Sequence, residues 1–271
     1  MVPVVVDYLV AQVRRRVSLR EAALPFPEIK ELAAQTPAPL DPTSPLLAPG
    51  CSIITELQCC QPQGSDPWEY TGIKSIAQEC EASGAAALSC HTDLPPFCGS
   101  HEDMRRAKGA VNIPLLCRDV IIDPYQIHEA RFYGADMLTV SLGLLLTRHS
   151  ESLVDRIGSL GMTPVLEVRN PKEAELAVSL GTGIIGINPQ LWGKASIDRE
   201  LIFQLIPLVR RGNQPIVVLS GVTTPAHVVA CARLGADAVI VSRGMSTTRT
   251  PGSLTREMVA AGQHPAIGTE N

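Results

Sequence analysis

Charged and amide side chains stand at the ends of several short apolar runs in this chain. Glu56, Glu167 and Asn188 each lie within or directly after such a run, and Arg118 follows another. A buried carboxylate is unfavourable unless it is paired or put to use. An arginine stabilises a developing oxyanion, but a side-chain pKa of more than about 12 makes arginine a poor proton donor. These residue types predict a site that binds an anion and in which carboxylates transfer protons.

Eight apolar runs, each followed by a helical pattern, are expected to position these side chains. They span residues 52–57, 86–90, 113–117, 137–141, 164–168, 183–187, 215–219 and 238–242. Continuous apolar runs, rather than alternation, indicate strands buried on both faces, as in a parallel sheet covered by helices. Several runs follow a glycine that can adopt the left-handed conformation ending a helix, namely Gly84, Gly134, Gly181 and Gly235.

The length and order of these units predict an α/β protein, a single (β/α)8 TIM barrel with an N-terminal helical extension. The glycine signals before every second run also suggest a quarter-barrel repeat. An open doubly wound sheet is the alternative. It usually has a glycine-rich nucleotide-binding turn after its first strand, and residues 58–64 do not supply one. In a barrel, the active site is expected at the C-terminal ends of the strands.

The N-terminal extension is expected over residues 1–50 and the barrel over residues 51–271, within the same domain. Two amphipathic patterns lie in the extension, at residues 5–18 and 27–34. Such an extension either packs over one mouth of the barrel and helps to enclose a ligand, or simply closes a core. The sequence does not distinguish these two roles.

The composition argues against several classes of protein. At 271 residues, with 45% hydrophobic and 18% charged residues, the chain can build a large core, and no apolar run approaches the roughly 18 residues that span a membrane. A net charge of −4 makes nucleic acid an unexpected partner. The N-terminus lacks the basic segment and the long apolar stretch of a signal peptide. We therefore expect a cytoplasmic protein without a membrane or nucleic-acid partner.

The eight cysteines show no Cys-x-x-Cys spacing, and the chain has no His-x-x-x-His pair of the kind found in zinc sites. Thiols buried as small apolar groups are the expected state, and no metal and no cofactor are predicted. The alternative is a functional thiol or a metal site near the expected strand ends, where Cys59, Cys60, Cys90, Cys117 and His91 lie.

Several segments resemble, in their order and spacing, those of indole-3-glycerol phosphate synthases. They are residues 53–57, 83–89, 92–93, 97–100, 116–131, 166–168, 184–188 and 220–225, and the likeness extends from about Val6 to about Leu254. The resemblance implies closure of a ring in a carboxyphenylamino-deoxyribulose phosphate with loss of CO2 and water. That chemistry needs an acid at the ketone oxygen, further proton transfers that expel water, and an anchor for the phosphate.

By position, the resemblance implies four catalytic residues, which are Glu56, Arg118, Glu167 and Asn188. Glu56, Glu167 and Asn188 match family residues on strands 1, 5 and 6. Arg118 stands where the family has a lysine, so we expect an oxyanion stabiliser there and not an acid. Loss of a positioned acid typically lowers a rate by about 10²–10⁴. Lys194, after the sixth run, is expected to be a solvated loop residue.

The other predicted site residues belong to a substrate pocket and an anion site. The substrate pocket is expected to comprise Gln58, Val120, Thr139, Ser141, Leu219 and Ser220. Gln58 and Leu219 replace a lysine and a glutamate of the family, and the polar Thr139 and Ser141 favour a smaller or more polar ligand. Backbone N–H groups after strands 7 and 8 commonly hold phosphate in barrels. The phosphate is therefore expected at Gly221, Ser242, Arg243 and Gly244.

Three functional hypotheses follow. The first is the family reaction with Arg118 in the place of the acid. The second is a related enzyme of specialised metabolism that acts on a different substrate, with Glu167 as base and Arg118 as oxyanion stabiliser. The third is a non-catalytic binding barrel. Under the first two, the partner is a small anionic substrate, and the protein is expected to be a monomer or a homodimer.

Overall fold

Parallel strands close into a barrel in the computed structural model, which describes residues 2–57, 72–92, 99–190, 192, 196–242 and 250–267. Each strand pairs with the next along the chain, and β8 pairs with β1. In chain order they are β1 (Ser52–Leu57), β2 (Ala87–His91), β3 (Leu115–Arg118), β4 (Met137–Ser141), β5 (Thr163–Val168), β6 (Ile184–Ile187), β7 (Ile216–Val222) and β8 (Ala238–Val241). The predicted (β/α)8 barrel is confirmed, and closure of β8 onto β1 excludes the open sheet.

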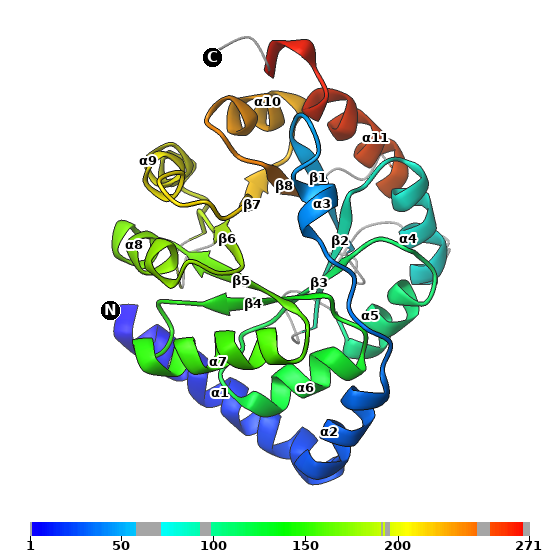
Figure 1. The fold of residues 1–271 in the computed structure, drawn as a ribbon, viewed down its shortest axis with the longest axis vertical. Coiled ribbons are helices and arrows are strands. Elements are labelled where there is room, and N and C mark those ends of the chain that lie inside the picture. The colour runs from blue at the N-terminus through cyan, green and yellow to red at the C-terminus, as the bar shows by residue number, and fades with distance from the viewer. Residues whose placement is uncertain are drawn as a thin grey trace.

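Helices form a ring outside the strands (Figure 1). Those that follow strands are α4 (Gly72–Ala82), α5 (His101–Lys108), α6 (Pro124–Phe132), α7 (Thr147–Ser159), α8 (Pro171–Leu180), α9 (Glu200–Val209), α10 (Pro225–Arg233) and α11 (Pro251–Gly262), before a 3-10 turn, η1 (Pro265–Ile267). In α7, for example, the buried Ser150, Leu153, Val154 and Ile157 recur at helical spacing, which gives one face toward the barrel. Within the described residues, every helix is too short or too polar to span a membrane.

Two of the glycines that precede strands are followed by an aspartate with a structural role, in the segments 134–136 and 235–237. Asp136 and Asp237 each precede a strand and accept the backbone N–H that begins the previous strand, at 2.7 Å from Leu115 and 2.7 Å from Ile216. The preceding glycine has a left-handed backbone, with φ of +100° at Gly235, which favours a residue without a Cβ. Each aspartate therefore fastens the start of one strand to the start of the next.

The barrel interior changes from apolar to polar along the strands. Side chains alternate between the two faces of a strand, so every second residue points inward. The apolar inner layer comprises Ile54, Ala87, Leu116, Met137, Val165, Ile184, Val217, Leu219, Ala238 and Ile240, with Leu46, which precedes β1, packed against it. Two residues beyond Ile54, Leu116 and Val165, the inward positions hold Glu56, Arg118 and Glu167. The alternation therefore brings the charged side chains to the C-terminal end of the barrel.

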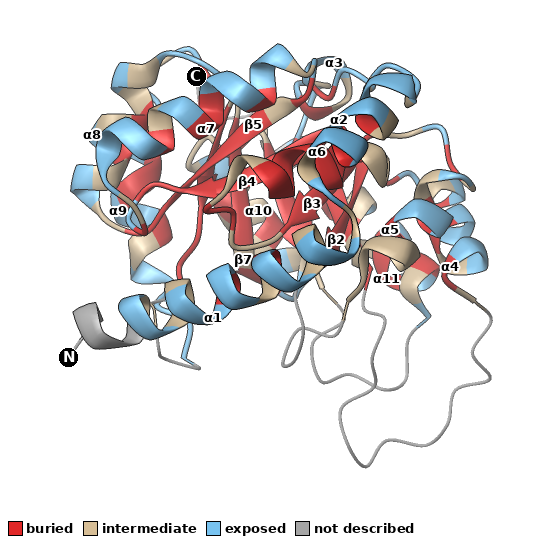
Figure 2. Ribbon diagram, turned by 90° about the horizontal axis from the view of Figure 1, so that it is seen from below, coloured by how far each residue is buried: buried red, intermediate tan, exposed pale blue. Residues whose placement is uncertain are grey.

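Three helices precede the barrel: α1 (Val2–Ala23), α2 (Phe26–Gln35) and α3 (Thr43–Leu46). The amphipathic segments expected at 5–18 and 27–34 lie within α1 and α2. Figure 2 shows α1 and α3 at opposite ends of the barrel, whose strands are almost entirely buried. Val13 and Val17 of α1 pack against Ile122 and Tyr125, in a cluster that also includes Val120. The first helix therefore covers the loop after β3, beside the end where the charged residues lie.

Candidate active site at the C-terminal end of the barrel

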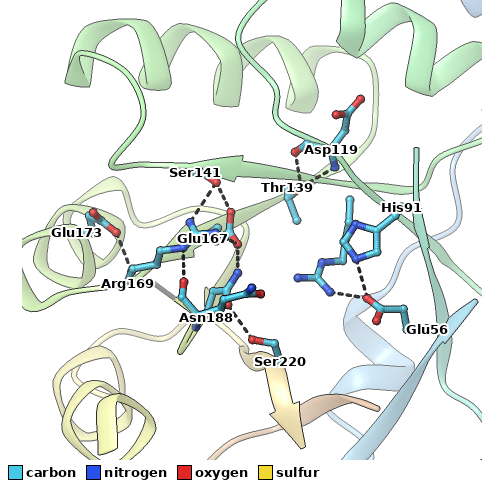
Figure 3. A network of polar contacts seen from close by, with 12 residues as sticks. Glu56, His91, Asp119, Thr139, Ser141, Glu167, Arg169, Glu173, Asn188 and Ser220 are labelled. Atoms are coloured by element: carbon cyan, nitrogen blue, oxygen red, sulfur yellow. Dashed lines mark hydrogen bonds and ion pairs between the residues drawn. The ribbon is translucent and has the colours of Figure 1, made fainter. Parts of the chain in front are cut away.

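The four residues predicted to be catalytic lie at the C-terminal ends of their strands. Glu56 is on β1, Arg118 ends β3, Glu167 is on β5, and Asn188 directly follows β6. Arg118, Glu167 and Asn188 are buried. Figure 3 shows polar contacts around Glu56, around Glu167, and between Asp119 and Thr139.

The Glu56 group joins residues of three neighbouring strands. Arg118 Nη1 donates to Glu56 Oε1 at 2.5 Å, and His91 Nε2, on β2, lies 3.0 Å from the same oxygen. Burial raises the pKa of Glu56, but the charge of Arg118 and the contacts of both partners outweigh burial and lower this pKa to about 2. Glu56 is thus ionised at neutral pH, and the Arg118 guanidinium is held against it.

The Glu167 group is a second buried ion pair with additional hydrogen bonds. Arg169 Nη2 and Asn188 Nδ2 both donate to Glu167 Oε1, at 2.9 and 2.5 Å, and the Ser141 hydroxyl donates to Oε2. Burial raises the pKa of Glu167, but the charges of Arg169 and Arg118 and the two neutral donors bring it below its ordinary value. Glu167 is therefore an ionised carboxylate with donors at both oxygens.

Arg169 is itself held in place on several sides. Its Nε donates to the carbonyl of Gln190 at 2.9 Å, and its guanidinium lies 3.7 Å from the ring centre of Trp192. A guanidinium stacked on an aromatic face gains a cation–π attraction. Its backbone N–H also donates to Glu173 Oε2 at 2.7 Å. The arginine is therefore a built part of the site.

Four of the six residues predicted to bind substrate lie on β4 and β7, in three different environments. Ser141 belongs to the Glu167 group, and Ser220 joins it because its hydroxyl donates to Asn188 Oδ1 at 2.7 Å. The Thr139 hydroxyl donates to the carbonyl of Asp119 at 3.2 Å and thus faces the start of the loop after β3. Leu219 is fully buried in the apolar inner layer, where it forms a floor beneath the polar groups.

Val120 is partly buried and packs against the cluster of α1, α2 and α6, and its place in the substrate pocket stays a prediction. The remaining predicted pocket residue, Gln58, lies outside the described residues, as do Lys194, Cys59 and Cys60.

The predicted phosphate residues are described only in part. Gly221 has a φ of +88° and lies where the pairing of β7 with β8 shifts register, between Val218 and Val222. Its carbonyl accepts from Arg199 Nε at 3.0 Å. Ser242 directly follows β8 and is half-buried. Arg243 and Gly244 lie outside the described residues, so the anion site stays a prediction.

Two of the cysteines near the strand ends, Cys90 and Cys117, are buried, as predicted. Burial raises the pKa of Cys117 far above the usual range of a thiol, so it is not a reactive thiolate. Within the described ranges, no three His, Cys, Asp or Glu side chains are grouped so as to hold a metal ion.

The sequence did not reveal two partners of the site carboxylates, His91 and Arg169. Both occupy inward positions four residues after a member of the apolar inner layer, Ala87 and Val165. The period-two alternation of a strand therefore carried the signal, although it did not say which opposite charge each would meet.

Comparison with known proteins agrees with this arrangement. A family model for indole-3-glycerol phosphate synthase matches residues 6–258. The indole-3-glycerol phosphate synthase of Saccharopolyspora erythraea is 36% identical over 266 residues, which cover 97% of each chain. That of Mycolicibacterium vanbaalenii is 38% identical over 262 residues, covering 97% of this chain and 96% of the relative.

Among solved structures, monomers of the dimeric phosphoribosylanthranilate isomerase from Thermotoga maritima share the fold, with a TM-score of 0.56 and 15% identity. The match covers 79% of this chain and 98% of the isomerase. At that identity the likeness shows the barrel fold alone. The family model and the full-length relatives go further, and this chain belongs to the indole-3-glycerol phosphate synthase family.

Proposed function

We propose that this chain is a lyase that closes the ring of a carboxyphenylamino-deoxyribulose phosphate and releases CO2 and water. Family membership over residues 6–258 supports the reaction class. The observation that carries the proposal is the pair of buried carboxylates at the barrel mouth, Glu56 and Glu167, each with an arginine at hydrogen-bond distance. The reaction needs both kinds of group, because it removes a proton and develops negative charge on an oxygen.

Arg118 is proposed to stabilise the negative charge that develops on the ketone oxygen as the aromatic carbon attacks. It lies at the end of β3, and its charge acts on Glu167 as well as on Glu56. A fixed cation in a buried site is effective here, since it needs little reorganisation at the moment of reaction.

Glu167 is proposed to accept the proton that leaves carbon during loss of water. Its lowered pKa keeps it ionised at neutral pH, at the expense of basicity. Asn188 and Ser141 act on the same carboxylate and are proposed to fix its orientation.

The phosphate is proposed to bind at the ends of β7 and β8, at the backbone N–H groups of Gly221, Ser242, Arg243 and Gly244. The register shift in β7 supports this, because it interrupts the ladder next to Gly221. Such interruptions leave backbone groups available to a ligand.

A second candidate is a related enzyme that keeps Glu167 as base and Arg118 as oxyanion stabiliser but acts on a different anionic substrate. The fully buried Leu219 favours it, because an apolar side chain stands where the resemblance expects a glutamate. Ser141 and Thr139 also line the strand ends with hydroxyls, which suit a more polar ligand.

The test is to incubate purified protein with the carboxyphenylamino-deoxyribulose phosphate and to follow indole fluorescence. We expect turnover, and we expect Glu167→Gln to abolish it, because the amide cannot accept the proton. Glu175→Gln, an exposed change on α8, is the matched control and should keep the activity. A folded but inactive wild type would exclude the family reaction and leave the second candidate or a non-catalytic barrel. Survival of activity in Glu167→Gln would refute the assigned base.

A further inference from the structure

His91 is a titratable residue of the mouth to which no role has yet been assigned. It ends β2, directly beside Arg118 in the register of β2 and β3. Its side chain is largely buried, with 16% exposed, and Nε2 lies 3.0 Å from Glu56 Oε1. Figure 3 shows the imidazole directed at the Glu56 carboxylate.

Ring closure requires a proton for the ketone oxygen, and the other described groups at the mouth supply one poorly. The carboxyls of Glu56 and Glu167 have lowered pKa values and carry no proton at neutral pH. An arginine does not release its proton. The lysines of the described residues lie on the outer helices, at Lys30, Lys74, Lys108 and Lys172. Histidine is the side chain that changes charge between about pH 5 and 8 and that most often transfers protons in enzymes.

We propose that His91, paired with Glu56, is the general acid of ring closure, in place of the lysine that Arg118 replaces. This inference rests on the proposed function. The imidazolium of His91 donates a ring N–H proton to the ketone oxygen. Glu56 holds Nε2 and orients the ring, as a carboxylate does for a catalytic histidine in other enzymes.

Ring closure moves the following bonds and protons. A carbon–carbon bond forms between the aromatic carbon that carries the carboxylate and the ketone carbon, and the carbonyl π bond moves to oxygen, which takes the proton of His91. The carbon–carboxylate bond then breaks, CO2 leaves, and its electron pair restores the aromatic ring. Neutral His91 regains a proton from solvent. The new hydroxyl leaves as water after a second protonation, while Glu167 takes a proton from the carbon next to nitrogen.

Charge at the mouth fits this role. Glu56 and Arg118 are the charged residues of the strands on either side of β2, and their charges cancel. A protonated His91 therefore gives the Glu56 group a net charge of +1 in a buried setting. That charge attracts an anionic substrate and is removed when the proton is transferred to the substrate.

The test compares His91→Gln with wild type and with His149→Gln, a change of an exposed histidine on α7. Glutamine keeps an N–H donor for Glu56 but cannot deliver a proton. We expect kcat to fall by about 10²–10⁴ and KM to change by less than about threefold in His91→Gln, with no loss in His149→Gln. Circular dichroism and the melting temperature show that each variant is folded.

The pH profile and a rescue variant separate an acid from a merely structural residue. An acid of this kind predicts a wild-type kcat that falls on the alkaline side, and this fall should be absent in His91→Gln. Adding Arg118→Lys to His91→Gln supplies a lysine that can act as the acid, so kcat should recover about tenfold or more and its alkaline fall should move to higher pH.

Three outcomes of these measurements would contradict the role proposed for His91. An active wild type with His91→Gln within about threefold in kcat refutes the acid while leaving the proposed function intact. A lowered kcat with an unchanged pH profile and no rescue by Arg118→Lys also refutes it, because His91 then only positions Glu56. A folded wild type without turnover overturns the proposed function and, with it, the role of His91 in that reaction.

Discussion

Removing the Arg169 guanidinium, as in Arg169→Met, should destabilise the protein in a way that depends on pH. Its side chain and that of Glu167 are only 9% and 8% exposed, and their charges meet at 2.9 Å. Breaking a buried pair typically costs about 3–5 kcal/mol, because the remaining charge is left uncompensated. Asn188, Ser141 and the charge of Arg118 still act on Glu167, so we expect the lower end, about 3 kcal/mol.

The sign of the pH dependence follows from the carboxyl. In the wild type the lowered pKa of Glu167 contributes stability that is present above its unfolded-state pKa and is lost as pH falls through the folded-state value. In Arg169→Met, burial dominates and the pKa of Glu167 rises above its unfolded-state value. Stability is then lost as pH rises, so the variant should fall further behind the wild type at pH 8 than at pH 5.

Urea unfolding of both proteins at pH 5 and pH 8 measures this difference. Loss of the stacking on Trp192 also contributes, but it does not depend on pH. The double variant Glu167→Gln/Arg169→Met is the matched control, because it carries no buried charge at this pair. It should be more stable than Arg169→Met alone at pH 8, with a coupling energy of at least about 1.5 kcal/mol. A coupling energy below about 0.5 kcal/mol, with the same loss of stability at both pH values, would refute the reasoning.

Two further changes test other buried carboxyl positions by the same urea assay. Leu219→Glu puts an unpaired carboxylate into the apolar inner layer, where the side chain is fully buried. It should lower the free energy of unfolding by about 2–5 kcal/mol, and by more at pH 8 than at pH 5. An equal loss at both pH values would contradict a buried acid at this position. Glu129 on α6 has its pKa raised to about 7 by burial, despite the charge of Arg20. The free energy of unfolding of the wild type therefore falls as pH rises through that value. Glu129→Gln should make this pH-dependent loss of stability smaller by about 2–3 kcal/mol. An unchanged loss would show that another group causes it.

The barrel and most of its site could be predicted because a strand repeats every two residues. The apolar positions at Ile54, Leu116 and Val165 fix which face points inward, and Glu56, Arg118 and Glu167 follow from them. Family resemblance added the reaction, and the glycine signals before every second run suggested the repeat of the units.

The pairing of charges could not be predicted in the same way. Which groups meet Glu56 depends on how far neighbouring strands are offset, and this offset brings Arg118 and His91 to the same carboxylate oxygen. Arg169, which directly follows β5, meets Glu167 two residues back along the chain, and Gln190 and Trp192 of the next loop hold its guanidinium. Val120 packs against the cluster that includes Val13 and Val17 of α1. This contact could not be predicted, because the strand pattern does not encode the position of a separate helix.

The central claim is that this mouth closes the ring of the family substrate without a lysine on β3. The most direct measurement is the conversion of the carboxyphenylamino-deoxyribulose phosphate by excess purified protein in a single turnover, with the indole product and the CO2 quantified together. The account predicts one CO2 for each indole formed, and no product from Glu167→Gln. A folded protein that leaves the substrate unchanged, or that releases CO2 without forming indole, would contradict it.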